Sequence, residues 1–258
     1  MPRKRSRKDH PLIRLLNRLL LLAIFAVTGW GGYGWLQANP AHNPWAPLDL
    51  RHVRTWATPS KLALLNEDMA ECRAALKRSD IAFTALEPVG EGECRREDRV
   101  QMSGLPLAPT MPQTTCRVAA SLYLWVEQDL RPDARAILGS DIRRIEHLGS
   151  YSCRRMYGAS TGSWSEHATG NAVDISAFVL EDGRRISLVA DWGAVEAAAS
   201  EAASSADSET ENRARFLRAA RDSACQLFGT VLSPDYNAAH ADHFHLDQGR
   251  PALTGFCR

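Results

Sequence analysis

Apolar residues follow two patterns along this 258-residue chain: one unbroken run near the N-terminus, then short periodic stretches separated by turns. The 18 residues from Leu19 to Leu36 include no charged side chain. As a helix rising about 1.5 Å per residue they would span roughly 27 Å, which matches the hydrocarbon core of a bilayer. The run therefore predicts a transmembrane helix over residues 12–36. A cleaved signal peptide is the alternative, since it also has a basic start and an apolar run, but no A-x-A-like site follows Leu36.

Charge sets the expected orientation of that helix. The formal net charge of the chain is only +1, yet five of the first eight residues are Lys or Arg. Residues 1–11 should form a basic tail that stays in the cytoplasm, which sends everything beyond about residue 40 across the membrane. The apolar run that follows the tail argues against a nucleic-acid-binding role, and we expect no nucleic-acid partner.

Beyond the apolar run the patterns predict a stalk and one folded domain. Residues 37–60 contain four prolines and no clear period, which indicates a stalk. Residues 61–258 should form the domain. Helices are predicted near 60–76, with Ser60 as N-cap, near 115–130, and around Phe216 to Leu227, ending at Gly229; strands are predicted near 142–152, 173–175, 186–189 and 243–247, with a hairpin turn at 181–183. The stretch 194–211, rich in Ala, Ser and Glu, reads as a solvated insertion.

The cysteines support export of the domain. All six lie beyond the apolar run and none shows C-x-x-C spacing, so a zinc ribbon or a redox motif is disfavoured. Three disulfides in an oxidising compartment are expected. Six cysteines allow 15 pairings, and we favour Cys225 with Cys257 because this bond would tie the C-terminal tail to the helix that precedes it.

Two short segments carry the candidate chemistry. In the first, Gly170 and Asn171 interrupt any helix between His167 and Asp174, which places His167 on a loop and Asp174 on the following strand. In the second, His243 and His245 lie two residues apart, so a strand would point both imidazoles to the same face. Either segment alone would also suit a structural histidine satisfied within the core.

Together the segments match a known pattern. H-x-x-G-x-A-x-D at 167–174, followed about 70 residues later by H-x-H at 243–245, resembles the metallopeptidase superfamily that includes lysostaphin, the D-Ala-D-Ala peptidases and the hedgehog signalling domain. The closer resemblance is to bacterial extensin-like C-terminal proteins, over roughly residues 70–258. It is carried by the sequence GSYSCR at 149–154, by residues 165–175, by Asp191-Trp192 and by residues 231–247.

The resemblance implies a site, a substrate and a location. His167, Asp174 and His245 would bind one catalytic Zn²⁺, and three protein ligands leave the fourth position that catalytic zinc keeps open. The implied substrate is a peptidoglycan peptide, cleaved as by a D,D-carboxypeptidase or an endopeptidase. The domain would lie in the periplasm, held at the bacterial inner membrane by residues 12–36. The alternative is a zinc-containing module that binds the cell wall without catalysis, as the hedgehog domain illustrates.

Other residues receive roles from the same resemblance. His243 is the favoured general base; Asp242 is the alternative, although a regular strand would turn it away from the metal. His240 is a candidate partner of the base or substrate contact. Arg154, with Arg155 as its competitor, would hold a substrate carboxylate or stabilise an oxyanion. Ser165 would donate a substrate hydrogen bond or act as a helix cap. The expected fold is α+β: a small, mostly antiparallel sheet that carries the zinc ligands, with helices packed on one side.

Overall fold

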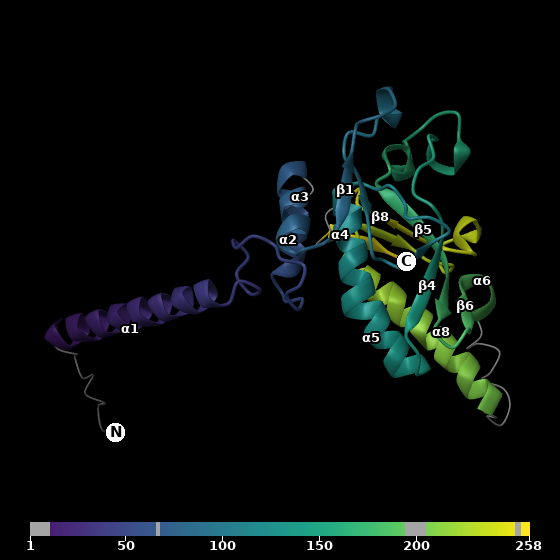
Figure 1. Cartoon of the computed structure of the whole chain (residues 1–258). Helices are drawn as coiled ribbons and strands as arrows, with labels where there is room; N and C mark the ends of the chain where they lie inside the picture. Colours follow the sequence, from purple (N-terminus) through teal and green to yellow (C-terminus); the bar gives the residue numbers. More distant parts are fainter. Residues whose placement is uncertain (1–10, 66–67, 194–204, 251–253) are drawn as a thin grey trace, which may run out of the picture.

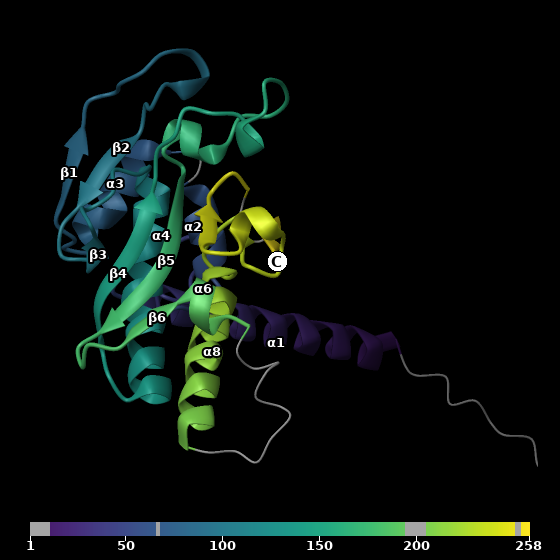
Figure 2. The same cartoon turned by 90° about the vertical axis from the view of Figure 1, so that its right-hand side faces the viewer.

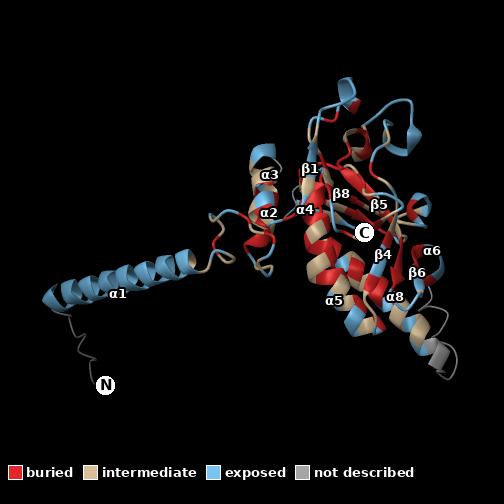
Figure 3. Ribbon diagram, in the orientation of Figure 1, coloured by how far each residue is buried: buried red, intermediate tan, exposed pale blue. Residues whose placement is uncertain are grey.

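The apolar run forms one long helix, α1 (Pro11–Ala38), which projects away from the rest of the chain (Figure 1). The computed structural model describes residues 11–65, 68–193, 205–250 and 254–258. Within α1 no residue is buried, and Figure 3 shows the helix in the exposed colour along nearly all of its length. The helix is long and apolar enough to cross a membrane, a property that an N-terminal signal sequence shares. Residues 1–10, nearly all of the predicted basic tail, lie outside the described residues.

The segment predicted as a stalk is partly folded into the body. Leu48 and Leu50 are buried and belong to the hydrophobic core. The sequence pattern missed this because two leucines among prolines show no period. The helix predicted over 60–76 is also two helices, α2 (Thr58–Leu64) and α3 (Met69–Arg78). Ser60 lies inside α2, and the side chain of Asp68 caps α3.

A mixed sheet of seven strands forms the centre of the body. Its order is β3-β4-β5-β8-β7-β9, and β6 also pairs with β5. These strands are β3 (Leu107–Ala108), β4 (Ile142–Gly149), β5 (Ala172–Leu180), β6 (Arg185–Ser187), β7 (Thr230–Leu232), β8 (Phe244–Asp247) and β9 (Phe256–Cys257). A separate hairpin pairs β1 (Phe83–Leu86) with β2 (Arg99–Met102).

This sheet corrects the predicted small, mostly antiparallel one. The central pairings are antiparallel, but β3 joins β4 and β9 joins β7 in parallel. Both added strands are two residues long. Strands of that length show no alternation of apolar and polar residues, so a sequence pattern cannot predict them.

Helices cover one face of the sheet (Figures 1 and 2), and apolar side chains of the sheet and of these helices form one hydrophobic core. A β-bulge between β4 and β5 shifts the alternation, so that Ile175 before it and Phe178 after it both reach the core. The ring of Phe178 packs edge-on against Trp125 of α4 (Cys116–Trp125) and Phe216 of α8 (Ser205–Ala224). The side chains of the candidate site are thereby left to the opposite face of the sheet.

The helix predicted near 115–130 is confirmed and runs further. Thr115 caps α4 at its start, two π-helical turns follow it, and Gly139 ends the stretch in a left-handed conformation. The remaining helical elements are α4 (Cys116–Trp125), η2 (Val126–Leu130), α5 (Arg131–Asp133), η3 (Ala134–Leu138), α6 (Leu188–Asp191) and α8 (Ser205–Ala224), with short 3₁₀ turns η1 (Gly92–Cys94), η4 (Met156–Gly158), η5 (Glu166–Thr169) and η6 (Ala238–His240). Of the predicted insertion at 194–211, residues 194–204 lie outside the described residues and the rest begins α8.

Three disulfides fasten these elements, as the cysteine pattern predicts. They join Cys72 to Cys116, Cys94 to Cys153, and Cys225 to Cys257. The last is the pairing expected from sequence, and it holds β9 beside the end of α8. The second fastens the start of the loop that leads into the candidate site.

Candidate metal centre

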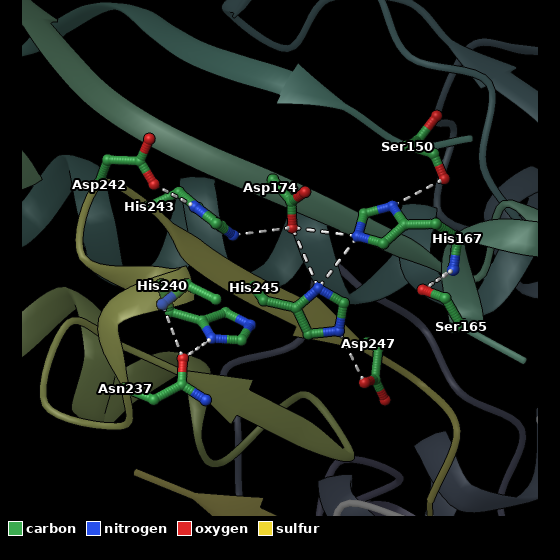
Figure 4. Close-up of polar contacts among 11 residues, drawn as sticks. Ser150, Ser165, His167, Asp174, Asn237, His240, Asp242, His243, His245 and Asp247 are labelled. Carbon is green, nitrogen blue, oxygen red and sulfur yellow. Dashed lines mark hydrogen bonds and ion pairs between the residues drawn. The ribbon is translucent and has the colours of Figure 1, made fainter. Parts of the chain in front are cut away.

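Two strands and one 3₁₀ turn bring three side chains to one point (Figure 4). Asp174 of β5 pairs directly with His245 of β8, so their side chains leave the sheet on the same face. His167 comes from η5, which Ser165 caps and Gly170 ends in a left-handed conformation. Gly170 thereby turns the chain from His167 into β5, as the sequence predicts for a glycine between the two residues.

The three side chains form a nearly equilateral triangle of potential ligand atoms. Asp174 Oδ1 lies 3.1 Å from His167 Nε2 and 3.0 Å from His245 Nδ1. The two ring nitrogens are themselves 3.0 Å apart. Atoms that each bind one zinc ion at about 2.0–2.1 Å are roughly this far from one another, so the spacing fits a metal ion. Among the described residues this is the one group of His, Cys, Asp and Glu atoms close enough to hold a metal.

The outer nitrogen of each imidazole has its own acceptor. His167 Nδ1 lies 3.3 Å from the carbonyl oxygen of Ser150. His245 Nε2 lies 2.9 Å from a carboxylate oxygen of Asp247. Because both acceptors require an N–H, each ring directs its other nitrogen to the centre of the triangle. Two imidazole nitrogens and a carboxylate oxygen then converge, an arrangement that needs a positive charge between them.

The pKa values of the metal-free protein show how that need is met. Burial alone would raise the pKa of Asp174, but hydrogen bonds from His167 and His245 hold it well below the usual range. Burial alone would lower the pKa of His245, but hydrogen bonds to Asp174 and Asp247 outweigh it and raise the pKa to about 9. Without metal, a proton on His245 therefore supplies the central charge. A bound cation would take the place of that proton.

The triangle lies in the wall of a pocket of about 760 Å³. This volume is in the range of small-molecule and peptide-fragment sites. The pocket draws its lining from the site strands, from the loop 154–165 and from the loop 236–240. Its lining residues beyond the triangle include Arg154, Tyr157, Trp164, Tyr236, Arg250 and Phe256. Aromatic rings and two guanidinium groups thus surround the ligand atoms.

Two further histidines line the same pocket. His243 Nε2 lies 3.7 Å from Asp174 Oδ1, beside the triangle, while its Nδ1 lies 2.7 Å from Asp242 Oδ1 on the other side of the ring. The side chain of Asp242 is 59% exposed and is separated from the triangle by His243. The geometry therefore puts the imidazole, and not the Asp242 carboxylate, next to the potential ligands.

His240 is held by a residue that the sequence did not single out, Asn237. The amide oxygen of Asn237 accepts from the backbone N–H of Ala239 and lies 2.8 Å from His240 Nδ1. Since that oxygen is an acceptor, His240 carries its proton on Nδ1 and presents Nε2 as a lone pair. Burial, followed by the charges of His243 and His245, lowers the pKa of His240 to about 4, so the ring is neutral at neutral pH. An Asn three residues before a His, at the start of a turn, was the available sequence signal.

The remaining predicted residues separate into two groups. Arg154 and Ser165 line the pocket, although the Ser165 hydroxyl already accepts from the backbone N–H of His167 and so also acts as the cap. Arg155 is outside the lining. Its guanidinium stacks on the Trp164 ring, 4.5 Å from the ring centroid, and donates to the carbonyl of Gly162. The structure thus favours Arg154 over Arg155 as the arginine that faces a ligand.

Tyr157 is a second pocket residue that the sequence did not single out. It has a positive φ of 56°, which is unusual for a residue with a side chain. Its hydroxyl accepts from the Asn237 amide at 3.3 Å, and its ring packs edge-on against His240. The loop that carries Tyr157 is thereby joined to the loop that positions His240.

Comparison with known proteins gives one family. The family model described as "Extensin-like protein C-terminus" matches residues 70–258, which include every pocket residue named above. No curated protein and no solved structure matches the chain.

Proposed function

The chain belongs to the extensin-like C-terminal family, and on that premise we propose that it is a membrane-anchored, zinc-dependent peptidase that cleaves an amide bond in peptidoglycan peptides. One observation carries the proposal. Three potential ligand atoms, 3.0–3.1 Å apart, converge in the wall of an open pocket that holds two more histidines. The motif's likeness to lysostaphin and the D-Ala-D-Ala peptidases supports the choice of metal and reaction.

His167, Asp174 and His245 would hold the metal. Two imidazoles and one carboxylate form a set typical of catalytic zinc, which uses three protein ligands. When bound, Zn²⁺ supplies Lewis-acid polarisation of a carbonyl and lowers the pKa of water. Ser150 and Asp247 hold the two imidazoles in the orientation that this set requires.

His243 is the general base in this proposal. Asp242 accepts a hydrogen bond from the N–H of Nδ1, so Nε2 faces the triangle as a lone pair able to take a proton from water. The same nitrogen would then return the proton to the leaving amine. Asp242 acts by orienting His243, which is a different role from that of the base itself.

The other side of the pocket would bind the substrate. Arg154 is exposed at the pocket wall and can pair with a carboxylate of the peptide through two parallel hydrogen bonds. The neutral His240, with its Nε2 lone pair, can accept from a substrate N–H. Aromatic side chains such as Tyr157 and Trp164 provide an apolar wall.

The location that we propose for the domain fits the proposed substrate. An apolar N-terminal helix with a basic flank and three disulfides in the body both favour placement outside the cytoplasm, in the periplasm of a bacterium. Peptidoglycan lies in that compartment. If the domain is instead a non-catalytic zinc module, the same pocket would bind cell-wall peptides and release them unchanged.

Digestion of purified peptidoglycan fragments tests the proposal. The full chain, reconstituted in vesicles, is expected to release new amine ends, to stop when metal is chelated and to resume when zinc is restored. The His147→Ala variant is a matched control, because His147 lies on β4 with its Nε2 at the carbonyl of Thr110, outside the pocket lining. If zinc stays bound and fragments bind, yet no amine ends appear at any metal loading, the peptidase proposal is wrong and the binding module remains.

A further inference from the structure

We propose that residues 39–57, between α1 and α2, lie in the headgroup layer of the bilayer that α1 spans and dock the domain against the membrane surface. This inference rests on the anchoring role proposed for α1. It concerns the opposite end of the chain from the pocket and needs none of the metal chemistry. Its basis is where the folded body begins, which side chains that region exposes, and how its charges are paired.

The folded body begins immediately after α1. The buried ammonium of Lys61, in a residue only 4% exposed, donates to the carbonyl of Pro40 at 2.6 Å. The Thr55 hydroxyl donates to the carbonyl of Ala41 at 2.6 Å. Pro40 and Ala41 lie two and three residues beyond the end of α1 at Ala38. These bonds leave no free tether, so the body cannot move far from the membrane.

The chain also stays compact between α1 and Trp45, the first large apolar side chain that the segment exposes. Successive turns close with hydrogen bonds from His42 N to Asn39 O and from Asn43 N to Pro40 O. Trp45 follows Ala38 by seven residues, a length that reaches at most about 25 Å when fully extended. Because the turns shorten this path, Trp45 lies closer to the end of α1 than this upper limit.

Large apolar side chains in this segment are exposed to an unusual degree. Trp45 is 82% exposed, Val53 80% and Trp56 67%. In the described body after α1, the only other large apolar side chain exposed above 60% is Val189, at 73%. Isolated exposed residues are ordinary, but three within 12 residues beside a membrane helix are not. Tryptophan and tyrosine are enriched at membrane–water interfaces.

The C-terminal end of α1 indicates how deep residues 39–57 lie in the bilayer. Trp30, Tyr33 and Trp35 lie near the C-terminal end of α1 and form the aromatic belt expected at an interface. The ring of Trp35 lies 5.1 Å from the ring of His42. The segment therefore begins at this aromatic belt, and Trp45 and Trp56 extend the belt.

Charges in the segment leave apolar contact as the main attraction. Arg51 pairs with Asp49 and Asp80, and Arg54 pairs with Asp129. With its arginines already paired to carboxylates, the segment offers little net attraction to anionic lipid. Docking should therefore be as strong on neutral phosphatidylcholine as on anionic vesicles, which separates it from binding by a polybasic surface.

Depth-dependent fluorescence quenching tests the proposal on the full chain in phosphatidylcholine vesicles. All six native cysteines are in disulfides, so Trp45→Cys, Trp56→Cys, Phe25→Cys and Val189→Cys each add one thiol for an environment-sensitive label. Val189 is the matched control, since it is exposed as fully as Trp56 but lies on α6, on the far side of the body from α1 (Figure 1). Phe25, in the middle of α1, reports whether the anchor inserts.

We expect lipids with a headgroup quencher to quench labels at 45 and 56 at least roughly twofold more than the label at 189. A quencher deep in the acyl chains should act on position 25 alone. If the label at position 25 is quenched but the labels at 45 and 56 are quenched no more than the label at 189, α1 is inserted and the docking proposal is wrong. If the label at position 25 is not quenched either, the anchoring role of α1 and the docking proposal are both wrong. Peptide cleavage by the unlabelled wild-type chain is measured separately, so neither result is confused with failure of the peptidase proposal.

Discussion

The inner and outer histidines of the pocket are positioned in different ways. His245 contacts His167 and Asp174 across 78 and 71 residues of sequence, because the pairing of β5 with β8 brings the two segments together. His240 and His243 are instead held by Asn237 and Asp242, three residues and one residue away. The inner set exists only when the sheet has formed. The outer set is oriented by its own loop.

This difference suggests a division of labour. A metal site needs several atoms fixed to within a fraction of an ångström, which neighbouring strands with a defined register can provide. Proton transfer and substrate contact need a correctly protonated ring that reaches into the pocket, which a local hydrogen bond can provide. We therefore expect substitutions in the inner set to remove metal, and substitutions in the outer set to leave metal bound and change turnover.

The His245→Ala variant should show the largest effect. It removes one of the three proposed ligands and the partner of both Asp174 and Asp247, so bound zinc and peptide cleavage should both be lost. Metal content by elemental analysis and release of amine ends are the two measurements. His147→Ala should keep both at the wild-type level. Stoichiometric zinc in purified His245→Ala protein would contradict the assignment of the inner set.

The His243→Ala variant should separate metal from catalysis. Its ring is beside the triangle but outside it, so zinc should remain while turnover falls by roughly 10²–10⁴-fold, the usual contribution of a general base. Asp242→Asn should reduce turnover less, because it removes an orienting partner and leaves the base. The opposite order, with Asp242→Asn the more damaging, would make Asp242 the base.

Asp247 should act on the metal from a distance. Its carboxylate receives the outer N–H of His245 at 2.9 Å and does not belong to the triangle. Outer partners of this kind are typically worth 10–100-fold in metal affinity, so Asp247→Asn should weaken zinc binding by about that factor. Competition with a chromophoric chelator measures it. Asp242→Asn is the control with unchanged affinity, and equal weakening in both variants would argue against a specific role for Asp247.

The sequence predicts those parts of the site that follow from local rules. Gly170 as a turn between His167 and Asp174, and the two-residue spacing of His243 and His245, are local features, and the structure brings the three predicted ligand residues together. The helix that starts at Thr115 and the Cys225–Cys257 disulfide were predicted for similar reasons. The register that places Asp174 opposite His245 is not local, and only the family motif suggested that they meet.

Where prediction failed, the missing information was tertiary. Leu48 and Leu50 look like stalk residues until the core that buries them is known. Arg155 and Arg154 are adjacent and chemically identical, and the structure distinguishes them because Arg154 lines the pocket while Arg155 stacks on Trp164. Strands β3 and β9 have no pattern of their own, because the neighbours they pair with determine them. Each case depends on a contact that the local sequence pattern does not show.

Acidity should weaken metal binding gradually. In the metal-free protein the pKa of His245 is raised to about 9, so at neutral pH the ring carries the proton that a metal must displace. Asp174, whose pKa is lowered, remains ionised throughout this range and adds no proton to the exchange. Zinc affinity should therefore fall about tenfold for each pH unit between 9 and 7, with release of about one proton per ion bound at pH 7.

Calorimetry in buffers of different ionisation enthalpy counts that proton. In Asp247→Asn, which loses one of the two carboxylates that raise this pKa, the slope should begin at a lower pH. An affinity that is independent of pH from 7 to 9 would show that the inner triangle is held together by something other than a proton on His245.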